Sequence, residues 1–526
     1  MASSVKEVDI LIVGSGLSGL ALAYFLRNYT NYSILISTKT RAGFGTSTFY
    51  SQGAFRCPGV SYSEEDYVKD TIEGGRYLNR RYLVELLARE CRDSISLLRN
   101  AGIVLRETQT GFRVVSDDPL FPGRELTVKL ANYLVKFGVE FLGGATMLDV
   151  FKLESGGYLT IHAVGGDLVA VGSRVVVLAT GGAANAYIRS DNPVQLSCDG
   201  HGVSLKLGLP LVDMEFVQFF PLGVAEDGKP AAMIPFTKGR LLNKFGEDIL
   251  HKYGLGSLGR AVVTARDALS RSMMLEVRSG RSIDGAISVE PEEVSDDLSL
   301  AGFEMMRRLG LKKPVKVLPT AHYTMGGVEV GPDLETGLPG VYVVGELVGG
   351  VHGANRLGGN ALTTCVTLSR RVALSIARYL EEKFGVEKGS LIGLREVRDT
   401  VGSYSFGESA LDPVKLRYEV RKLMWEKVGV LRTSEELEEA VDYLYRVAES
   451  LSRAEARNVR ELVALREAEN TVYTSISIAL SALKREESRG SHYRLDHPEE
   501  RSEWVKSLRV VYRDGKVSIA GEVSVG

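Results

Sequence analysis

Arg356 is a residue whose surroundings in the sequence suggest chemistry. It lies in the stretch Val351–Leu362, VHGANRLGGNAL, where most of its neighbours are small. This stretch follows an apolar run that predicts a strand, and it precedes Thr363–Leu380, which predicts a helix. A planar guanidinium among glycines and alanines can bind both oxygens of a carboxylate ligand. The alternative is an arginine in a surface turn.

The N-terminal segment contains a glycine motif for phosphate binding. Residues 8–28, VDILIVGSGLSGLALAYFLRN, predict a strand, a turn and an amphipathic helix, with glycines at Gly14, Gly16 and Gly19. The first glycine permits the tight turn, the second lets the backbone approach a pyrophosphate, and the third lets the helix pack on the strand. The helix then directs its partial positive charge toward the phosphates. This segment is therefore predicted to bind a dinucleotide.

The ends of later strands favour FAD over NAD as that dinucleotide. The second strand ends in Ser37, Thr38 and Lys39, where an NAD domain usually has an acidic residue that binds the ribose. A second apolar run ends in small residues at 179–182, and a third has Glu346 at its end. Three strand ends that converge on small residues and one acid suit a single extended cofactor.

The composition is typical of a soluble globular protein of two or three domains. The chain has 526 residues, of which 44% are hydrophobic and 25% charged, and its formal net charge is −2. This charge gives no reason to expect nucleic acid or an anionic membrane as a partner. The N-terminus has Glu7 and Asp9 where a signal peptide would be basic, and the apolar run at 10–26 contains three glycines. We therefore expect a cytoplasmic protein without direct membrane insertion.

The four cysteines are Cys57, Cys91, Cys198 and Cys365, and no two are near each other in the sequence. Their spacing contains no CxxC pair and no local ligand set for an iron–sulfur cluster. We therefore predict no metal site, and the pattern fits a reducing compartment.

Motifs along nearly the whole chain resemble the flavoprotein family of succinate dehydrogenase, fumarate reductase and L-aspartate oxidase. In chain order they are VGSGLSG, STFYSQG, LATGG, SCDGHGVSLKLGLPLVDMEFVQF, ARDALSRSM, PTAHYTMGG, GVYVVGEL, HGANRLGGNAL and REESRGSHYRLDHPE. The resemblance implies an α/β fold, in which a Rossmann-like FAD-binding domain carries an inserted α+β capping domain and is followed by a helical C-terminal domain. It places the FAD-binding domain at residues 1–225 and 315–380, the capping domain at 226–314 and the C-terminal domain at 381–526.

The pattern of the C-terminal residues independently supports a helical domain. Leu411–Gly429 and Ser434–Leu483 have apolar residues at three- and four-residue spacing, with charged residues between them. Near the end, Asp514 and Gly515 lie between two alternating runs, which predicts a β-hairpin.

The resemblance also implies how FAD is held. The respiratory members bond FAD covalently to a histidine in the loop before their AQGG motif; Ser47 takes that place here, and the loop is closest to that of L-aspartate oxidase. FAD is therefore expected to bind without a covalent bond. For Asp199, a helix N-cap is an alternative role. The predicted cofactor-binding residues are Gly14, Ser15, Gly16, Ser18, Gly19, Ser37, Lys39, Ser47, Thr48, Gln52, Gly53, Thr180, Gly181, Asp199, Glu346, Asn360 and Leu362.

Three catalytic residues are carried over from the resemblance. Arg356 resembles the family's arginine for the substrate carboxylate, His322 its substrate-binding histidine, and Arg266 the arginine that donates or accepts a proton. Each has a plainer alternative. Arg266 could form a surface ion pair with Asp267, and His322 could be a hydrogen-bonded core histidine.

Two departures from the family pattern concern the substrate. Phe220 stands where the family motif EFVQFHP has a histidine, and the capping segment IPFTKGRLLN is shortened, so that Thr237 and Lys238 replace the family's donors only in part. Losing a neutral donor to a buried carboxylate typically costs about 1–3 kcal/mol. The glutamate with which L-aspartate oxidase meets the substrate ammonium also has no clear counterpart here.

The leading hypothesis is an FAD-dependent oxidoreductase resembling L-aspartate oxidase, which oxidises a small carboxylate such as L-aspartate and passes electrons to oxygen or fumarate. The second hypothesis is a flavoprotein subunit of fumarate reductase or succinate dehydrogenase, which would need an iron–sulfur partner. The third is an FAD-binding protein whose substrate site has decayed or changed specificity.

Overall fold

The computed structural model describes residues 4–154, 156–384, 394–404, 406–407 and 411–525. The first three residues of the N-terminus and residues 385–393 of the predicted C-terminal domain lie outside this description.

A seven-stranded sheet forms the centre of the N-terminal part. Its strands run in the order β6 (Glu140–Gly143), β2 (Ile34–Thr38), β1 (Ser4–Val13), β9 (Asp167–Leu178), β8 (Tyr158–Val164) and β7 (Ala145–Lys152), with β16 (Val341–Val343) also paired to β9. Strands β6, β2, β1, β9 and β16 are parallel, whereas β8 and β7 are antiparallel. Mostly parallel strands need both faces covered, which explains the buried apolar runs at residues 10–13 of β1, 34–36 of β2 and 175–178 of β9.

Helices α1 (Leu17–Tyr29) and α10 (Asn360–Phe384) pack against each other on this sheet. All residues from Leu17 to Leu26 are buried, because α1 lies between the sheet and α10. The apolar N-terminal run is therefore a strand followed by a core helix, as predicted. Within the described ranges, no helix is both long enough and apolar enough to span a membrane.

A second sheet has a hydrophobic core of its own. It consists of β11 (Val217–Val224), β14 (Val315–Thr324), β13 (Ile287–Pro291) and β12 (Gly239–Leu242), all antiparallel. Helices α6 (Ile249–Lys252), α7 (Leu258–Thr264), α8 (Arg266–Arg278) and α9 (Asp297–Leu309) accompany it. Phe220, Phe236 and Met273 belong to this separate core. The exact domain limits stay a prediction.

The C-terminal part is mainly helical, as the residue pattern predicted. Its helices are α12 (Pro413–Lys427), α13 (Ser434–Ser452) and α14 (Val459–Lys484), so the long predicted helix is interrupted between residues 453 and 458. The predicted hairpin is formed by β17 (Lys506–Arg513) and β18 (Lys516–Ser524). Asp514 and Gly515 both have positive φ (50° and 77°), which is typical of the tight turns that join twisted strands.

The remaining elements complete the connections. They are β3 (Ala54–Arg56), α2 (Glu64–Gly74), α3 (Arg81–Ser96), β4 (Leu105–Thr108), β5 (Gly111–Val114), α4 (Gly123–Lys136), α5 (Asp199–Lys206), β10 (Leu211–Val212), β15 (Gly327–Val328), α11 (Leu394–Gly402) and 3₁₀ turns at Leu97–Ala101, Ala184–Ala186, Gly345–Leu347 and Ser502–Trp504.

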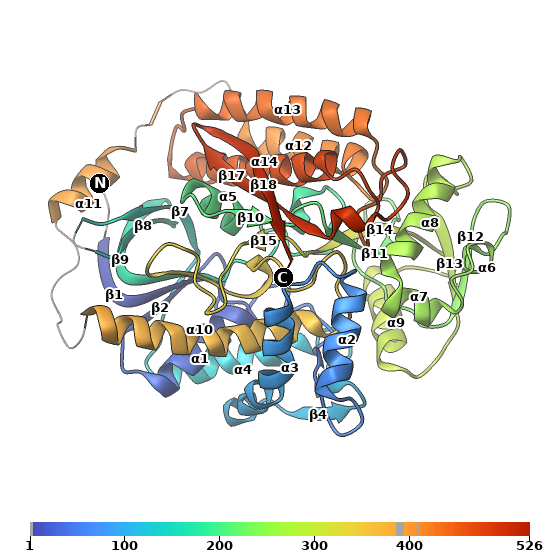
Figure 1. Cartoon of the computed structure of the whole chain (residues 1–526), viewed down its shortest axis with the longest axis horizontal. Coiled ribbons are helices and arrows are strands. Elements are labelled where there is room, and N and C mark those ends of the chain that lie inside the picture. The colour runs from blue at the N-terminus through green and yellow to red at the C-terminus, as the bar shows by residue number, and fades with distance from the viewer. Residues whose placement is uncertain (1–3, 155, 385–393, 405, 408–410, 526) are drawn as a thin grey trace.

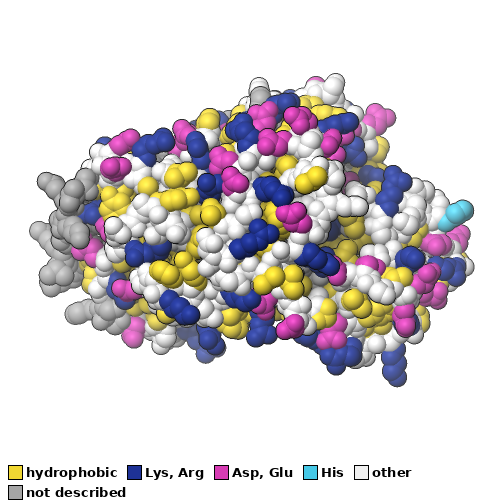
Figure 2. Space-filling view, turned by 90° about the horizontal axis from the view of Figure 1, so that it is seen from below, with side chains coloured by type: hydrophobic (Ala, Val, Ile, Leu, Met, Phe, Trp, Pro, Cys, Tyr) yellow, Lys and Arg dark blue, Asp and Glu magenta, His cyan; other side chains and the backbone are white. Residues whose placement is uncertain are grey.

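Figure 1 shows how these parts are arranged. The seven-stranded sheet lies at the left above α1 and α10, the C-terminal helices cover the top, and the second sheet with α6 to α9 stands at the right. Strands β11 and β14 connect the second sheet to the middle of the molecule. On the face seen in Figure 2, acidic and basic side chains alternate with apolar ones, without a large area of one charge.

Cys57 and Cys91 form a disulfide, in contrast with the expectation drawn from the cysteine spacing. The two residues are 34 positions apart in the sequence, but Cys91 on α3 and Cys57 just after β3 lie in the same core. Spacing along the chain did not reveal this contact because it is made by tertiary packing. Cys198 and Cys365 are free.

We predict that a denatured, non-reduced sample titrates as two thiols per chain, because only Cys198 and Cys365 are free. Closing a loop of this length should stabilise the fold by about 4 kcal/mol. The double variant Cys57→Ala, Cys91→Ala should therefore have a lower Tm than the unchanged protein. Cys198→Ala is the control, because it leaves the cross-link in place. Titration of four thiols would contradict the pairing.

Candidate active site

Three parallel strands end side by side at one edge of the main sheet. Val13 of β1 pairs with Leu178 of β9, which also pairs with Val343 of β16, so the three carboxyl ends are in register. Gly14 follows the first end with φ of 115°, and a side chain there would run into the carbonyl of Ala179. Ligands of open α/β sheets bind outside such strand ends.

The loop after β2 closes over the start of α1. Ser15 Oγ lies 2.8 Å from Thr38 Oγ1 and accepts a hydrogen bond from the backbone N of Gly43 at 3.1 Å. Thr48 Oγ1 accepts from the backbone N of Leu17 at 3.4 Å, at the first residue of α1. Several predicted cofactor-binding residues are thus brought together around one helix start.

Buried polar atoms at this edge fit a polar cofactor. Ser37 Oγ, Thr180 Oγ1 and Asn360 Oδ1 are buried without a hydrogen-bond partner in the described part of the chain. An unpaired buried polar atom is costly, and a bound group that supplies the partner removes this cost. The residues present therefore fit FAD, which offers phosphate, ribose and ring atoms.

Lys39 and Asp199 form the centre of a charged cluster. Lys39 Nζ lies 2.7 Å from Asp199 Oδ2 and 2.6 Å from Glu467 Oε1. Asp199 is the first residue of α5, and Cys198 occupies the N-cap position, so the N-cap alternative is wrong. Glu467 was not recognised in the sequence because it comes from α14, far along the chain.

The other predicted cofactor-binding residues are more scattered. Glu346 Oε1 accepts from the backbone N of Thr324 at 2.9 Å, and burial raises the pKa of its carboxyl to about 7. Gln52 donates instead to the carbonyl of Leu120, and Leu362 packs in the main core. Gly16 is the N-cap of α1, and Ser18 and Gly19 are in its first turn. Gly53 directly precedes β3, and Gly181 lies shortly after the end of β9.

Arg266 and Arg356 converge on one oxygen. Arg356 Nη2 donates to Gln218 Oε1 at 3.1 Å, and Arg266 Nη1 donates to the same atom at 3.3 Å. Gln218 is fixed because its Nε2 donates to Asn355 Oδ1 at 2.8 Å and to the carbonyl of Arg356 at 2.9 Å. We call Arg266, Arg356 and Gln218 the clamp. The arginines come from α8 and from the loop after β16, and Gln218 of β11 joins them.

The clamp is positively charged, and two of its residues, Arg356 and Gln218, are buried, whereas Arg266 is partly exposed. Arg356 is 6% exposed, so the surface-turn alternative is wrong, and its Nε lacks a partner among the described residues. Burial and the charge of Arg356 lower the pKa of Arg266 to about 9. Arg266 also donates from Nε to the carbonyl of Val262 at 2.7 Å, and in the described chain neither arginine has a carboxylate within ion-pair distance.

His322 lies next to the clamp and is paired with a carboxylate. Its Nδ1 is 2.8 Å from Asp191 Oδ2, and its side chain is 22% exposed, so it is not a fully enclosed core histidine. Burial lowers its pKa, as do the charges of Arg356 and Arg266, whereas Asp191 acts in the opposite direction. His322 is thus held in one orientation beside two guanidinium groups.

The departures from the family pattern have clear structural positions. The guanidinium of Arg266 lies 5.3 Å from the centre of the Phe220 ring, which is 5.7 Å from the His322 ring. Thr237 Oγ1 donates to Asp296 Oδ2 at 2.6 Å at the start of α9, and Lys238 is exposed. An aromatic ring therefore lies close to both the arginine and the histidine, and the hydroxyl of Thr237 is already engaged.

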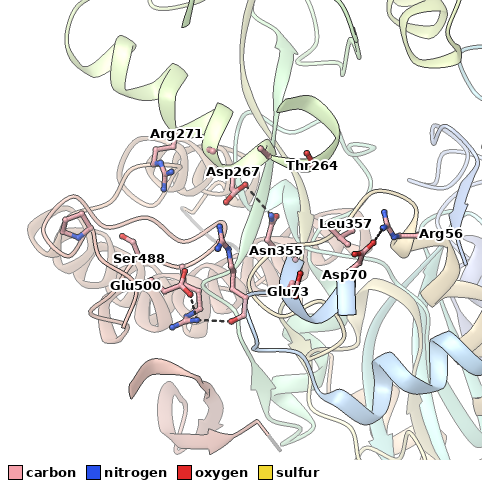
Figure 3. Close-up of a pocket in the computed structure, with 17 residues that line it drawn as sticks. Arg56, Asp70, Glu73, Thr264, Asp267, Arg271, Asn355, Leu357, Ser488 and Glu500 are labelled. Carbon is pink, nitrogen blue, oxygen red and sulfur yellow. Dashed lines mark hydrogen bonds and ion pairs between the residues drawn. The ribbon is translucent and has the colours of Figure 1, made fainter. Parts of the chain in front are cut away.

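A pocket of about 570 Å³ adjoins both arms of the clamp. Its lining includes Asp267, next to Arg266, and Asn355, next to Arg356. Figure 3 shows these two side chains turned toward each other, with Asn355 Nδ2 3.5 Å from Asp267 Oδ1. Across the same pocket Arg56 pairs with Asp70 (Figure 3).

Sequence reasoning missed three polar residues of this region. Gln218 lies within the motif EFVQF, where its position two residues before Phe220 on one strand was a usable signal. Asp191 and Asn355 gave no such signal, because their roles depend on contacts with residues more than 80 positions away.

We predict that acid or heat denaturation releases all of the FAD into the supernatant, because Ser47 offers a hydroxyl where a covalent link would need a histidine. Ser47 Oγ donates to Asn192 Oδ1 at 3.0 Å. The absorbance of supernatant and pellet measures this, and yellow colour that stays with the precipitate would contradict non-covalent binding.

Comparison with known proteins identifies the family of this chain. Residues 9–362 match the model of the FAD binding domain, and residues 417–522 match that of the fumarate reductase flavoprotein C-terminus. One subunit of fumarate reductase (CoM/CoB) from Methanothermobacter marburgensis is 29% identical, over 97% of this chain and 98% of that protein. L-Aspartate oxidase from Saccharolobus solfataricus is also 29% identical, over 96% of this chain and 99% of that protein.

A solved structure has the same overall fold. The flavoprotein chain of E. coli quinol fumarate reductase superposes with a TM-score of 0.87 at 25% identity, and the match covers 99% of this chain and 97% of that one. The equal identities to a reductase and an oxidase do not distinguish between these activities. The family models, the two relatives and the solved structure together confirm the resemblance and the predicted fold class. This chain belongs to the flavoprotein family of succinate dehydrogenase, fumarate reductase and L-aspartate oxidase, and it is an oxidoreductase with FAD as its cofactor.

Proposed function

We propose that this protein transfers a hydride between a small carboxylate and FAD, with L-aspartate as the first candidate substrate. The observation that carries the proposal is the clamp, in which the guanidinium groups of buried Arg356 and of partly exposed Arg266 share one neutral oxygen. A buried positive charge without a counter-ion is costly, and two adjacent ones raise that cost. An anionic ligand that binds beside Gln218 removes it.

A carboxylate suits the clamp better than a single point anion does. Arg356 lies with its guanidinium 4.3 Å from the centre of the Tyr323 ring, which fixes the plane of the group. A fixed planar guanidinium donates two parallel hydrogen bonds to the two oxygens of a carboxylate. Arg266 approaches from another element, so the clamp determines the orientation of the ligand as well as its charge.

Orientation is the main contribution that this chain makes to the chemistry. Bound FAD supplies the two-electron acceptor for the hydride. Arg266 and Arg356 hold the carboxylate, and the Phe220 ring lies beside both Arg266 and His322. Positioning of this kind converts an encounter into a reaction between fixed neighbours.

A flavoprotein subunit of fumarate reductase or succinate dehydrogenase is the second candidate. The sequence identity to the fumarate reductase subunit from Methanothermobacter marburgensis equals the identity to the L-aspartate oxidase. The comparison therefore supports the second candidate as strongly as the first. The described residues contain no group of three or more histidine, cysteine or acidic side chains that could hold a metal. Electrons would then have to pass through an iron–sulfur partner.

An altered substrate is the third candidate, and Phe220 motivates it. The ring lies where a donor for a second carboxylate would be expected from the family pattern, and Thr237 is bonded to Asp296. With these donors absent or engaged, a substrate with one carboxylate and an apolar remainder fits the site as well as a dicarboxylate does.

We expect L-aspartate to bleach the flavin absorbance under anaerobic conditions. Bleaching by succinate alone, or isolation with an iron–sulfur protein, would favour the second candidate, and bleaching by monocarboxylates alone would favour the third. If none of these acids changes the flavin spectrum, the proposed activity is wrong and the decayed-site hypothesis takes its place.

We expect Arg356→Leu to abolish flavin reduction by the substrate while FAD stays bound. The loss of a charge-assisted bidentate contact should lower kcat/KM by at least about 100-fold. Arg278→Leu is the matched control, because Arg278 is an exposed residue of α8 that faces Glu436. Near-normal turnover of Arg356→Leu, with Arg278→Leu also normal, would refute the role of the clamp.

A further inference from the structure

Glu467 is a carboxylate of α14 that reaches the edge of the main sheet from the distant C-terminal part of the chain. Its Oε1 lies 2.6 Å from Lys39 Nζ and accepts a hydrogen bond from Ser197 Oγ at 3.0 Å. Its Oε2 lies 3.0 Å from Arg417 Nη1 of α12. One side chain thus connects two C-terminal helices with residues that come 270 and 428 positions earlier in the sequence.

Lys39 follows the strand end that meets the ribose in dinucleotide-binding folds. It comes directly after Thr38, the last residue of β2, and Thr38 Oγ1 lies 2.8 Å from Ser15 Oγ in the glycine turn. Ser37 Oγ, at the same strand end, is buried without a hydrogen-bond partner among the described residues. The end of β2 is therefore suited to a polar ligand, and Lys39 is the charged residue beside it.

Asp199 connects the same cluster with the end of β9. It is the first residue of α5, and its Oδ2 lies 2.7 Å from Lys39 Nζ. The next residue, Gly200, packs so closely that a Cβ there would lie 2.0 Å from Thr180 Oγ1. Thr180 follows β9, and its Oγ1 is another buried atom without a partner in the described chain. Lys39 and Asp199 therefore lie beside unsatisfied hydroxyl groups at the two strand ends that flank β1.

Two carboxylates hold the ammonium group of Lys39 in place. A lysine side chain has a flexible four-carbon stem, so one partner alone would leave it free to swing. Asp199 contacts Nζ from α5 and Glu467 contacts it from α14. Burial lowers the pKa of Lys39, but the charges of Asp199 and Glu467 outweigh burial and raise this pKa above its usual value. Lys39 therefore stays charged, and Glu467 helps to determine where that charge lies.

Close packing of α14 on α5 keeps Glu467 at this place. The two helices lie side by side (Figure 1), and Asn470 Nδ2 of α14 donates to Asp199 Oδ1 at 3.4 Å. A Cβ at Gly202 of α5 would lie 2.6 Å from Asn470 Cα, so only glycine permits this contact. Asn470 is buried. Glu467 is thus presented by packed backbone, unlike the partners of a mobile surface ion pair, which contributes little.

We propose that Glu467 is a positioning residue of the FAD site, through which the C-terminal helices help to hold the cofactor. Glu467 acts through Lys39 and Asp199, which it keeps at the ends of β2 and β9. Because such coupling is reciprocal, bound FAD stabilises the contact of α14 with the main sheet in turn. The inference concerns cofactor binding, so it does not depend on which carboxylate reacts with the flavin.

The test measures how fast the intact holoprotein releases FAD after dilution, from the rise in fluorescence of free FAD at fixed pH and salt concentration. We expect Glu467→Gln to release FAD about 10-fold faster or more, because a neutral amide cannot replace the charge-assisted contact with Lys39. The circular dichroism and Tm of both holoproteins show whether the variant is folded.

Glu469→Gln is the matched control. Glu469 is on the same helix and also ties it to α5, because its Oε2 lies 2.9 Å from Lys206 Nζ. The substitution removes the same charge, but Lys206 is the last residue of α5, whereas Asp199 is the first. It should weaken the contact between the helices without reaching Lys39, so we expect FAD release to be unchanged.

A double-mutant cycle tests the route through Lys39. If Glu467 acts through this lysine, Lys39→Met releases FAD as fast as Lys39→Met combined with Glu467→Gln, since the second change has no partner left to affect. Hydrogen exchange of the unchanged protein is a further readout that needs no variant. Loss of FAD should speed the exchange of amides at residues 459–471 of α14 more than that of amides in α13.

Every outcome supports or overturns the inference. FAD release that is unchanged in Glu467→Gln would overturn it. Equal acceleration in Glu467→Gln and Glu469→Gln would also overturn it, because Glu467 would then only anchor α14 to α5. Additive effects in the cycle, or exchange in α14 that ignores FAD, would contradict the coupling through Lys39. None of these results decides the proposed activity, which is judged separately by reduction of the flavin.

Discussion

Two adjacent positive charges, on buried Arg356 and partly exposed Arg266, share one neutral oxygen, and this contact is the constraint on which the site depends. Guanidinium groups that share an acceptor repel each other, and burial removes the water that would screen them. Burial lowers the pKa of both arginines, and the charge of Arg356 lowers that of Arg266 further. The arrangement persists only because each arginine is fixed by its own element, and it becomes favourable once an anion binds. Under the proposed function, a carboxylate substrate therefore completes the electrostatics of the folded protein.

The distant C-terminal part helps to hold this arrangement. The backbone N of Ser491 donates to the carbonyl of Ala354 at 3.0 Å, which supports the loop that carries Arg356. Ser491 follows a segment fixed by Arg485, which is fully buried and lies 3.0 Å from Glu487. Buried ion pairs add little net stability, but removing one partner leaves an uncompensated charge. This requirement gives the C-terminal helices a role in the geometry of the site as well as in the core.

The sequence predicted those features that follow from local pattern. The strand, glycine turn and helix at Gly14 to Gly19, the C-terminal helices and the turn at Asp514 all depend on neighbouring residues, and each was found. Features that depend on tertiary contacts were missed. The disulfide of Cys57 with Cys91 and the pairing of His322 with Asp191 join segments whose proximity no local pattern encodes. Arg356 was noticed because its neighbours are small, but its partner Gln218 was not.

The site is polar on one side and apolar on the other, and this asymmetry limits what it can bind. The clamp and the His322–Asp191 pair lie together, whereas Phe220 belongs to the core of the second sheet. A ligand held by its carboxylate against the arginines, as proposed, lies near that ring, whose centre is 5.3 Å from the guanidinium of Arg266. The adjoining pocket is lined by acidic and basic side chains alike, with Asp267 among the first and Arg271 among the second. An amino dicarboxylate such as L-aspartate, the proposed substrate, would find partners of opposite charge there for its ammonium group and for its second carboxylate.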